Sequence, residues 1–125
     1  MNDDLLQAVV DTAIDGLILI EADGRIALFN TACERLFGYT PAEVLGRNVS
    51  MLMPEPDRSA HDGYIHRYRS TGEKRIIGIG REVMGRRKDG TVFPFELAVG
   101  AYSRDGRQMF VGVIHDLTKY RLSLQ

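Results

Sequence analysis

Apolar residues change their spacing along the 125-residue chain, and each change predicts a different kind of structure. Near the N-terminus, residues 3–13 carry leucines and valines at helical spacing, which predicts a short amphipathic helix. Two compact apolar runs follow, at 16–20 and 25–29, and Asp23 and Gly24 lie between them. Asp-Gly favours a type I′ turn, in which both central positions need positive φ, so the two runs are predicted to form a hairpin.

Residues that typically begin and end helices recur in the middle of the chain. Asn30 or Thr31 is expected to cap a helix that ends at Gly38. Residues 40–43, with the sequence TPAE, combine a capping box with proline at the first helical position, which predicts a second short helix. A third helix is predicted over about residues 60–70, between a capping pair and a glycine.

The last part of the chain is typical of a sheet. Residues 75–84, 91–102 and 108–117 are strand candidates, with Asp-Gly turns at 89–90 and 105–106. Two strands, several short helices and three strands, in that order, predict an α+β domain with an antiparallel sheet and the helices on one face. A cavity between a sheet and its helices is a usual place for a small ligand.

Composition and charge narrow the class of protein. The chain is 44% hydrophobic and 26% charged with a formal net charge of −1, so no bulk attraction to nucleic acid or to an anionic membrane is expected. No apolar run approaches the roughly 18 residues that span a bilayer, and the start, MNDDLLQ, lacks the basic residues of a signal peptide. A lone cysteine, Cys33, forms no internal disulfide. We therefore expect a cytoplasmic protein or a cytoplasmic part of a larger one.

A histidine lies on the apolar face of the predicted 60–70 helix. His61, Tyr64, Ile65 and Tyr68 follow one another at positions i, i+3, i+4 and i+7, so they share that face. A neutral imidazole in such surroundings is a competent axial ligand for haem iron. A core histidine bonded to a backbone carbonyl is the commoner meaning of a single histidine, and periodicity alone favours it.

The strand that follows brings an arginine to the same side. Because side chains alternate along a strand, Arg81 falls on the face of Ile77 and Ile79. A buried guanidinium is costly without an anion or strong acceptors, which a haem propionate, bound dioxygen or a protein carboxylate would each supply. A position of Arg81 at the edge of the sheet, with its charged group in water, explains the sequence equally well. The next strand puts four apolar side chains on one face: Phe93, Phe95, Leu97 and Val99. They fit either a porphyrin face or ordinary core packing.

Three segments together resemble the haem-binding PAS domain of FixL-type oxygen-sensor histidine kinases. They are FNTACERLFGYTPAEVLGRNV, MLMPEPDRSAHDGYIHRYRSTGEKRIIGIGREVMGRRKDGTVFPFELAVG and VGVIHDLT, and the resemblance runs from about Leu5 to Tyr120. It implies a single PAS domain with a five-stranded antiparallel sheet and short helices on one face. Residues 1–13 would form an N-terminal flanking helix, 14–118 the sensor domain and 119–125 the start of a C-terminal linker helix.

The resemblance also implies a cofactor and its contacts. In the family, the residue matching His61 ligates the iron of haem b, and the residue matching Arg81 bonds dioxygen or, without it, a propionate. The other implied contacts are Tyr64, Arg67, Tyr68, Arg75, Ile76, Ile79, Phe95, Leu97 and Val99. The implied function is a haem-based sensor of oxygen or another diatomic gas in a bacterial signal-transduction protein, a two-component histidine kinase.

The expected partners follow from the same resemblance. We expect a homodimer through the N-terminal helix or the sheet face, an output domain C-terminal to this chain, and no nucleic acid or membrane contact. No enzyme active site is expected in this fragment. The alternative is a PAS interaction module without haem, either empty or holding a small metabolite or a non-covalent flavin. Covalent flavin chemistry is disfavoured because the segment GRNVSMLMP contains no cysteine.

Overall fold

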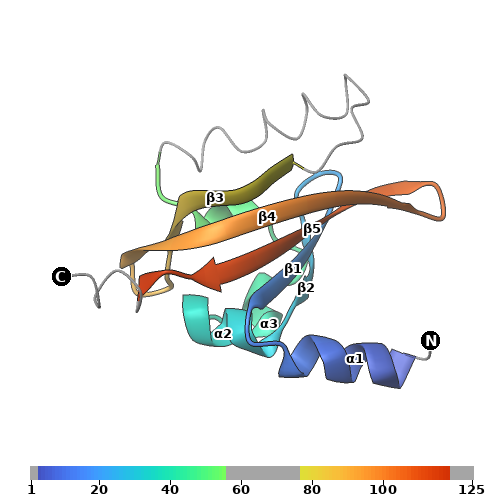
Figure 1. Cartoon of the computed structure of the whole chain (residues 1–125), viewed down its shortest axis with the longest axis horizontal. Helices are drawn as coiled ribbons and strands as arrows, with labels where there is room; N and C mark the ends of the chain where they lie inside the picture. Colours follow the sequence, from blue (N-terminus) through green and yellow to red (C-terminus); the bar gives the residue numbers. More distant parts are fainter. Residues whose placement is uncertain (1–2, 56–76, 119–125) are drawn as a thin grey trace.

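The computed structural model describes residues 3–55 and 77–118 and shows one sheet with helices against it (Figure 1). In chain order the elements are α1 (Asp3–Thr12), β1 (Gly16–Glu21), β2 (Ile26–Phe29), α2 (Thr31–Phe37), α3 (Pro41–Val44), the 3₁₀ helix η1 (Val49–Leu52), β3 (Ile77–Arg86), β4 (Val92–Arg104) and β5 (Arg107–Asp116). The five strands lie in the order β2-β1-β5-β4-β3, and all neighbours are antiparallel. The predicted α+β class and five-stranded sheet are confirmed.

The Asp-Gly pairs at 23–24 and 105–106 form two different kinds of turn. Between β4 and β5, Asp105 and Gly106 have φ of 51° and 79°, as a type I′ turn requires. Between β1 and β2, only Gly24 has positive φ, so the type I′ turn predicted at Asp23 is wrong. There the amide of Gly24 donates to the carbonyl of Glu21 at 2.8 Å. The connection between β1 and β2 is longer than the one between β4 and β5 and needs only one residue in the left-handed region, which is Gly24.

The boundaries of α2 and α3 follow the caps that the sequence predicts, whereas η1 was not predicted. Asn30 caps α2 through its side chain, and Gly38 ends the helix with φ of 80°. Thr40 and Glu43 form the capping box of α3. The helix predicted over 60–70 lies outside the described residues. Local capping bonds and the glycine after α2 therefore set the boundaries of these two helices.

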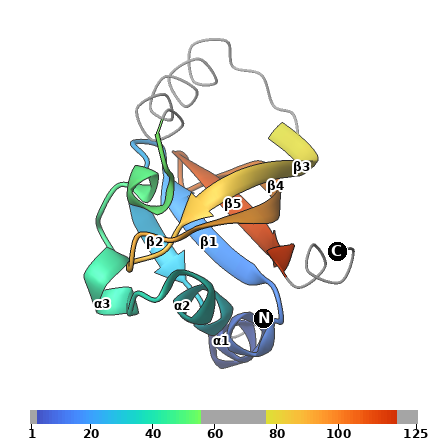
Figure 2. The same cartoon turned by 90° about the vertical axis from the view of Figure 1, so that its left-hand side faces the viewer.

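The core lies on the sheet face against which α2, α3 and η1 pack (Figure 2). Its buried members are Ile18, Ile26, Phe29, Cys33, Phe37, Val44, Val49, Leu52, Phe93, Phe95 and Ile114. The ring of Phe37 lies edge-on to Phe93 and Phe95, with centroids at 5.4 and 6.1 Å. The aromatic rings thus fill the end of this inner face that lies next to α2.

Gly85 of β3 lies beneath these rings. A Cβ at this position would lie 2.6 Å from Cε1 of Phe95 and 3.1 Å from Cε1 of Phe93. Real Cβ atoms essentially never come as near as the first of these distances. The absence of a side chain here allows the two rings to pack directly on the strand.

Asn30 joins three elements through one buried side chain, which is 2% exposed. Its Oδ1 accepts from the amides of Leu17, at 2.9 Å, and Cys33, at 3.1 Å. Its Nδ2 donates to the carbonyls of Val10, at 3.0 Å, and Asp15, at 3.2 Å. The end of α1, the start of β1 and the first turn of α2 are therefore bonded to the same amide group.

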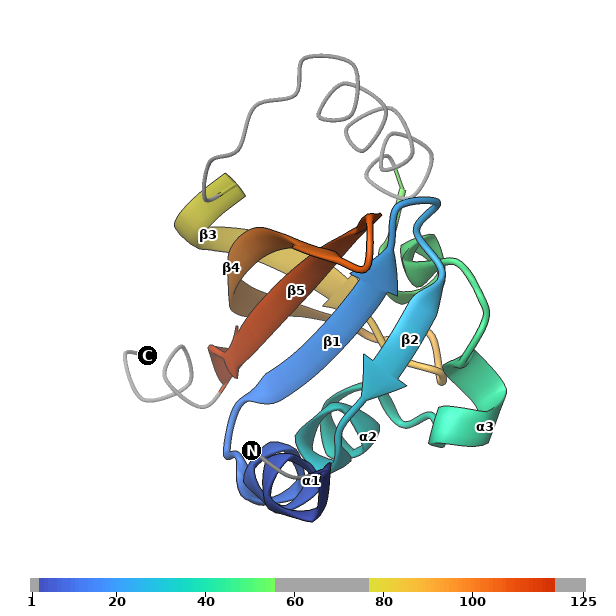
Figure 3. The same cartoon turned by 90° about the vertical axis from the view of Figure 1, so that its right-hand side faces the viewer.

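The other face of the sheet is not covered by α2 or α3 (Figure 3). Its half-buried apolar side chains are Leu17, Leu19, Leu28, Ala98, Val111 and Val113. Exposed apolar residues also gather in and after α1: Leu5, Leu6, Val9 and Ile14. Of the helices in the part of the chain that the structure describes, none is long and apolar enough to cross a membrane.

Candidate functional site

Cross-strand pairing places Arg81 on the inner face of the sheet. Arg81 lies opposite Leu97, and Val83 lies opposite Phe95. Directly paired residues project to the same side of a sheet, and both β4 partners belong to or pack against the core. Arg81 therefore shares the face of the apolar wall on β4, as the sequence predicted.

Arg81 differs from the expectation in its exposure. Its side chain is exposed, whereas Val83, two residues further along β3, packs against the core. The pairing of β3 with β4 is irregular just before Arg81. Between the pairs Ile77–Val99 and Arg81–Leu97, β3 advances four residues while β4 advances two. This bulge interrupts the simple alternation assumed from the sequence and locally bends the strand.

The predicted wall of β4 divides into a filled part and a half-open part. Phe95 is only 5% exposed and packs on Phe37 and Phe93. Leu97 and Val99 are half-buried. The aromatic end is thus ordinary core, and the end with Leu97 and Val99 offers apolar surface next to Arg81.

The neighbouring strand continues this wall. On β5, Ile114 lies opposite Leu97, and Gly112 lies opposite Val99. A Cβ at Gly112 would meet Cδ1 of Leu97 at 3.5 Å. Sequence reasoning missed these two positions because alternation within one strand does not identify its cross-strand partners.

The remaining predicted site residues lie outside the described residues: His61, Tyr64, Arg67, Tyr68, Arg75 and Ile76. Of Ile79 the structure describes the backbone alone. The site as described consists of Arg81 at the edge of an apolar wall. It offers apolar surface and, beside it, a cation that could meet a negatively charged or partly negative group.

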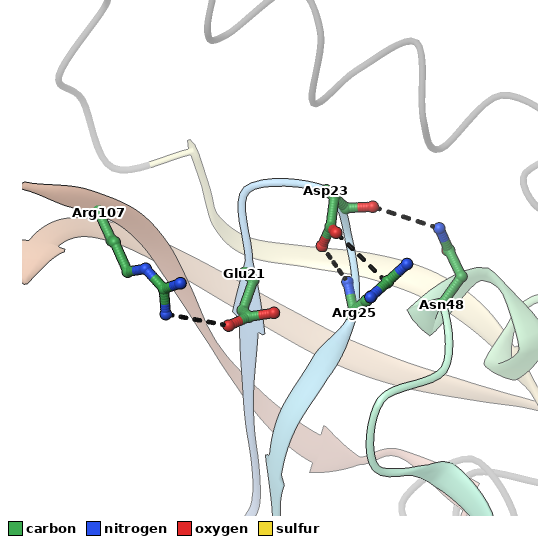
Figure 4. A network of polar contacts seen from close by, with 5 residues as sticks. All are labelled: Glu21, Asp23, Arg25, Asn48 and Arg107. Atoms are coloured by element: carbon green, nitrogen blue, oxygen red, sulfur yellow. Dashed lines mark hydrogen bonds and ion pairs between the residues drawn. The ribbon is translucent and has the colours of Figure 1, made fainter.

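A polar network fixes the chain next to η1 (Figure 4). Arg25 pairs with Asp23 at 3.3 Å, and Nδ2 of Asn48 donates to the carbonyl of Asp23 at 3.4 Å. A second pair, 3.8 Å long, joins Glu21 to Arg107 between β1 and β5. Asn48 is the N-cap of η1. The turn between β1 and β2 is therefore hydrogen-bonded to the residue at which η1 begins.

A shallow groove lies between α2 and the turn that joins β3 to β4, lined by Arg35, Phe37, Gly38, Arg87, Lys88 and Asp89. Two of its cations, Arg87 and Lys88, already have partners. Arg87 lies 4.0 Å over the ring of Phe93 and donates to the carbonyl of Leu36 at 3.1 Å. Lys88 pairs with Glu43. We therefore assign this groove to the attachment of the turn to α2.

Comparison with known proteins identifies the family. The PAS fold model matches residues 4–117. The chain is 50% identical over 116 residues to "Sensor protein FixL" of Bradyrhizobium diazoefficiens, which covers 93% of this chain and 23% of FixL. It is 35% identical over 101 residues to "Oxygen sensor protein DosP" of Escherichia coli, covering 81% of this chain and 13% of DosP.

A third relative is "Cell-division control histidine kinase PdhS" of Brucella ovis. It is 35% identical over 117 residues, which cover 93% of this chain and 11% of PdhS. The chain thus spans less than a quarter of the length of each of these relatives. The family model covers nearly all of the chain, and the observed strands and helices follow the order that the resemblance implied. The chain belongs to the PAS family.

Proposed function

We propose that this domain is the haem-based oxygen-sensing module of a bacterial signal-transduction protein, a two-component histidine kinase. The observation that carries the proposal is the 50% identity with Sensor protein FixL across 93% of the chain. The likeness to a protein named as an oxygen sensor and to one named as a histidine kinase supports it. The proposed units are a flanking helix over 1–13, the sensor over 14–118 and a linker from 119, all in the cytoplasm.

The described residues fit a haem group. Leu97 and Val99 present half-buried apolar surface, and the exposed side chain of Arg81 lies on the same face. By the resemblance, His61 would hold the iron, and the other contacts would be Tyr64, Arg67, Tyr68, Arg75, Ile76, Ile79 and Phe95. When bound, ferrous haem supplies the iron to which dioxygen or another diatomic gas binds.

Arg81 is the residue that would convert binding into a change of structure. Its guanidinium carries five N–H donors and a permanent charge. It is exposed and follows the bulge in β3, so the fold does not bury it in one position. Differential contact with a propionate and with a partly negative gas ligand would bias β3 between two arrangements.

The sheet offers a route from Arg81 to the end of the domain. β3 pairs with β4, and β4 pairs with β5. Beyond β5, the amide of Leu117 donates to the carbonyl of Pro94 at 3.2 Å, and the amide of Thr118 donates to Asp116 at 2.9 Å. A shift of β3 and β4 would therefore alter the path toward a C-terminal output domain.

The proposed assembly is a homodimer formed through α1 or the uncovered sheet face. Leu5, Leu6 and Val9 of α1 are 55, 50 and 55% exposed. Exposed apolar surface of this kind marks contact sites in soluble proteins. Size-exclusion chromatography with light scattering gives the stoichiometry, and Leu6→Glu should shift a dimer toward monomer if α1 forms the contact.

An absorption spectrum tests the cofactor. Protein reconstituted with haem should show an intense Soret band that shifts on reduction and again on adding oxygen or carbon monoxide. His61→Ala should abolish stable uptake and leave the circular dichroism spectrum unchanged. A colourless protein that takes up no cofactor would support the interaction module, and flavin absorbance would support the flavin alternative.

Arg81→Ala tests the gas contact, with Arg86→Ala as its control. Arg86 is also exposed on β3, but it pairs with Val92 and projects to the outer face. Loss of a hydrogen bond from a charged donor predicts about a tenfold to hundredfold loss of oxygen affinity in Arg81→Ala. Carbon monoxide affinity should fall less, and Arg86→Ala should change neither. Equal losses for both gases would contradict the role of Arg81.

A further inference from the structure

A histidine on β5 pairs with an aspartate from the connection between α1 and β1. Nδ1 of His115 lies 2.9 Å from Oδ1 of Asp15, although the two residues are 100 positions apart in the sequence. Both side chains are partly exposed, at 59 and 40%. Gly16 pairs with Ile114 across the two strands, so Asp15 and His115 meet where β1 begins and β5 ends.

The side chains that face His115 are acidic. Glu96 of β4 lies directly opposite His115, and Glu82 of β3 lies opposite Glu96. Asp116 follows His115 in the chain. The hydrogen bond to Asp15 raises the pKa of His115 above its ordinary value of 6.5, and the charges of Asp15, Glu96 and Asp116 act in the same direction.

Each partner lies next to a segment that leaves the sheet. The carbonyl of Asp15 accepts from Asn30, which also holds the carbonyl of Val10 in α1. His115 precedes Asp116, whose carboxylate accepts from the amide of Thr118. The pair therefore bridges the segment that follows α1 and the segment that leaves the sheet.

We propose that His115 and Asp15 form a pH-sensitive clasp between the N-terminal connection and the C-terminal exit of the domain. An imidazolium bonds a carboxylate more strongly than a neutral imidazole does. Because the folded protein raises the pKa of His115, the added strength is complete below about pH 6.5 and is lost as pH rises through the raised value. This clasp uses neither the inner face nor a cofactor, so it is independent of the proposed gas sensing.

Two-dimensional NMR measures the titration of His115 directly. The wild-type imidazole should titrate above the ordinary value, and Asp15→Asn should move its pKa most of the way back. Glu96→Gln, which removes a carboxylate but leaves the direct partner, should move the pKa less. A wild-type pKa at the ordinary value, or one insensitive to Asp15→Asn, would overturn the clasp.

Hydrogen exchange measures the mechanical consequence, using the amides of Leu17 and Leu117. Both amides have assigned acceptors near the clasp, on Asn30 and Pro94 respectively. After correction for intrinsic exchange, their protection should be about twofold to fivefold higher at pH 6 than at pH 8.5, the range for an exposed ion pair. The amide of Ile26, bonded to the carbonyl of Arg47, is the distant reference and should not change.

Two variants of His115 separate the clasp from other titrations. His115→Gln should remove the pH dependence at Leu17 and Leu117, whereas His115→Arg should keep protection high at both pH values. The same pH dependence in wild type and His115→Gln would refute the proposal. An effect that grows with protein concentration would assign His115 to contact between copies and would also refute it.

Discussion

Replacing Asn30 with alanine removes the amide group that joins α1, β1 and α2. Four hydrogen bonds are lost, with donor to acceptor distances of 2.9, 3.1, 3.0 and 3.2 Å. Because Asn30 is 2% exposed, water cannot readily replace it. The backbone groups that it served would then be left without a partner in a buried position.

The expected cost follows from these four bonds. At about 1 kcal/mol for each net hydrogen bond, their sum is about 4 kcal/mol. The N-cap bond to Cys33 is one of the four and matches the usual cost of losing a cap, about 1 kcal/mol. The side chain no longer loses rotamer freedom on folding, which returns up to about 1 kcal/mol. We therefore expect Asn30→Ala to lower the free energy of unfolding by about 3 kcal/mol.

Urea denaturation followed by circular dichroism measures this loss, and Asn48→Ala is the matched control. Asn48 also caps a helix, but its side chain makes bonds of 2.9 and 3.4 Å at a less buried site, so about 1 kcal/mol or less is expected. Asn30→Asp keeps the acceptor oxygen and loses both donated bonds. Equal losses in Asn30→Ala and Asn48→Ala, or no loss in Asn30→Asp, would refute the reasoning.

Three further predictions concern single sites. Gly85→Ala should lower the free energy of unfolding by about 1–3 kcal/mol because its Cβ would meet an aromatic ring at 2.6 Å, whereas Gly100→Ala, with a nearest contact of 3.4 Å, should change it little in the same urea titration. Cys33 is fully buried with its pKa raised to about 12 by burial, so maleimide at pH 8 should label it only when urea unfolds the protein; rapid native labelling would contradict this. The hydrogen bond from Lys88 lowers the pKa of Glu43, so Lys88→Met should raise that pKa toward 4.5 in an NMR titration, and an unchanged pKa would contradict the pairing.

The caps of α2 and α3 could be predicted because their causes are local, whereas the order of strands in the sheet depends on pairing between distant segments. The capping box at Thr40 and Glu43, the cap at Asn30 and the glycine after α2 each act within four residues. Such signals are present in any short window of sequence. The alternation of Phe93 and Phe95 likewise identified the inner face of β4.

The position of Arg81 could be predicted only in part, because it depends on pairing between strands. Alternation predicted its face, but the bulge after Ile77 is a property of the register with β4, and the exposure of Arg81 depends on which segments cover the strand. The turn at Asp23 shows the same limit. Its dipeptide also occurs at 105–106, yet the two turns differ because the flanking strands pair differently.

The two proposed signals meet at the end of β5 from opposite sides of the sheet. A change at Arg81 would arrive through β3 and β4 from the inner face, and the charge on His115 acts between β1 and β5 on the outer face. Arg81 lies opposite Leu97 of β4, and His115 lies opposite the adjacent residue, Glu96. Additivity is usual only for sites that are far apart and share no partner, so both signals would reach the exit at Asp116 as coupled contributions to the same strand.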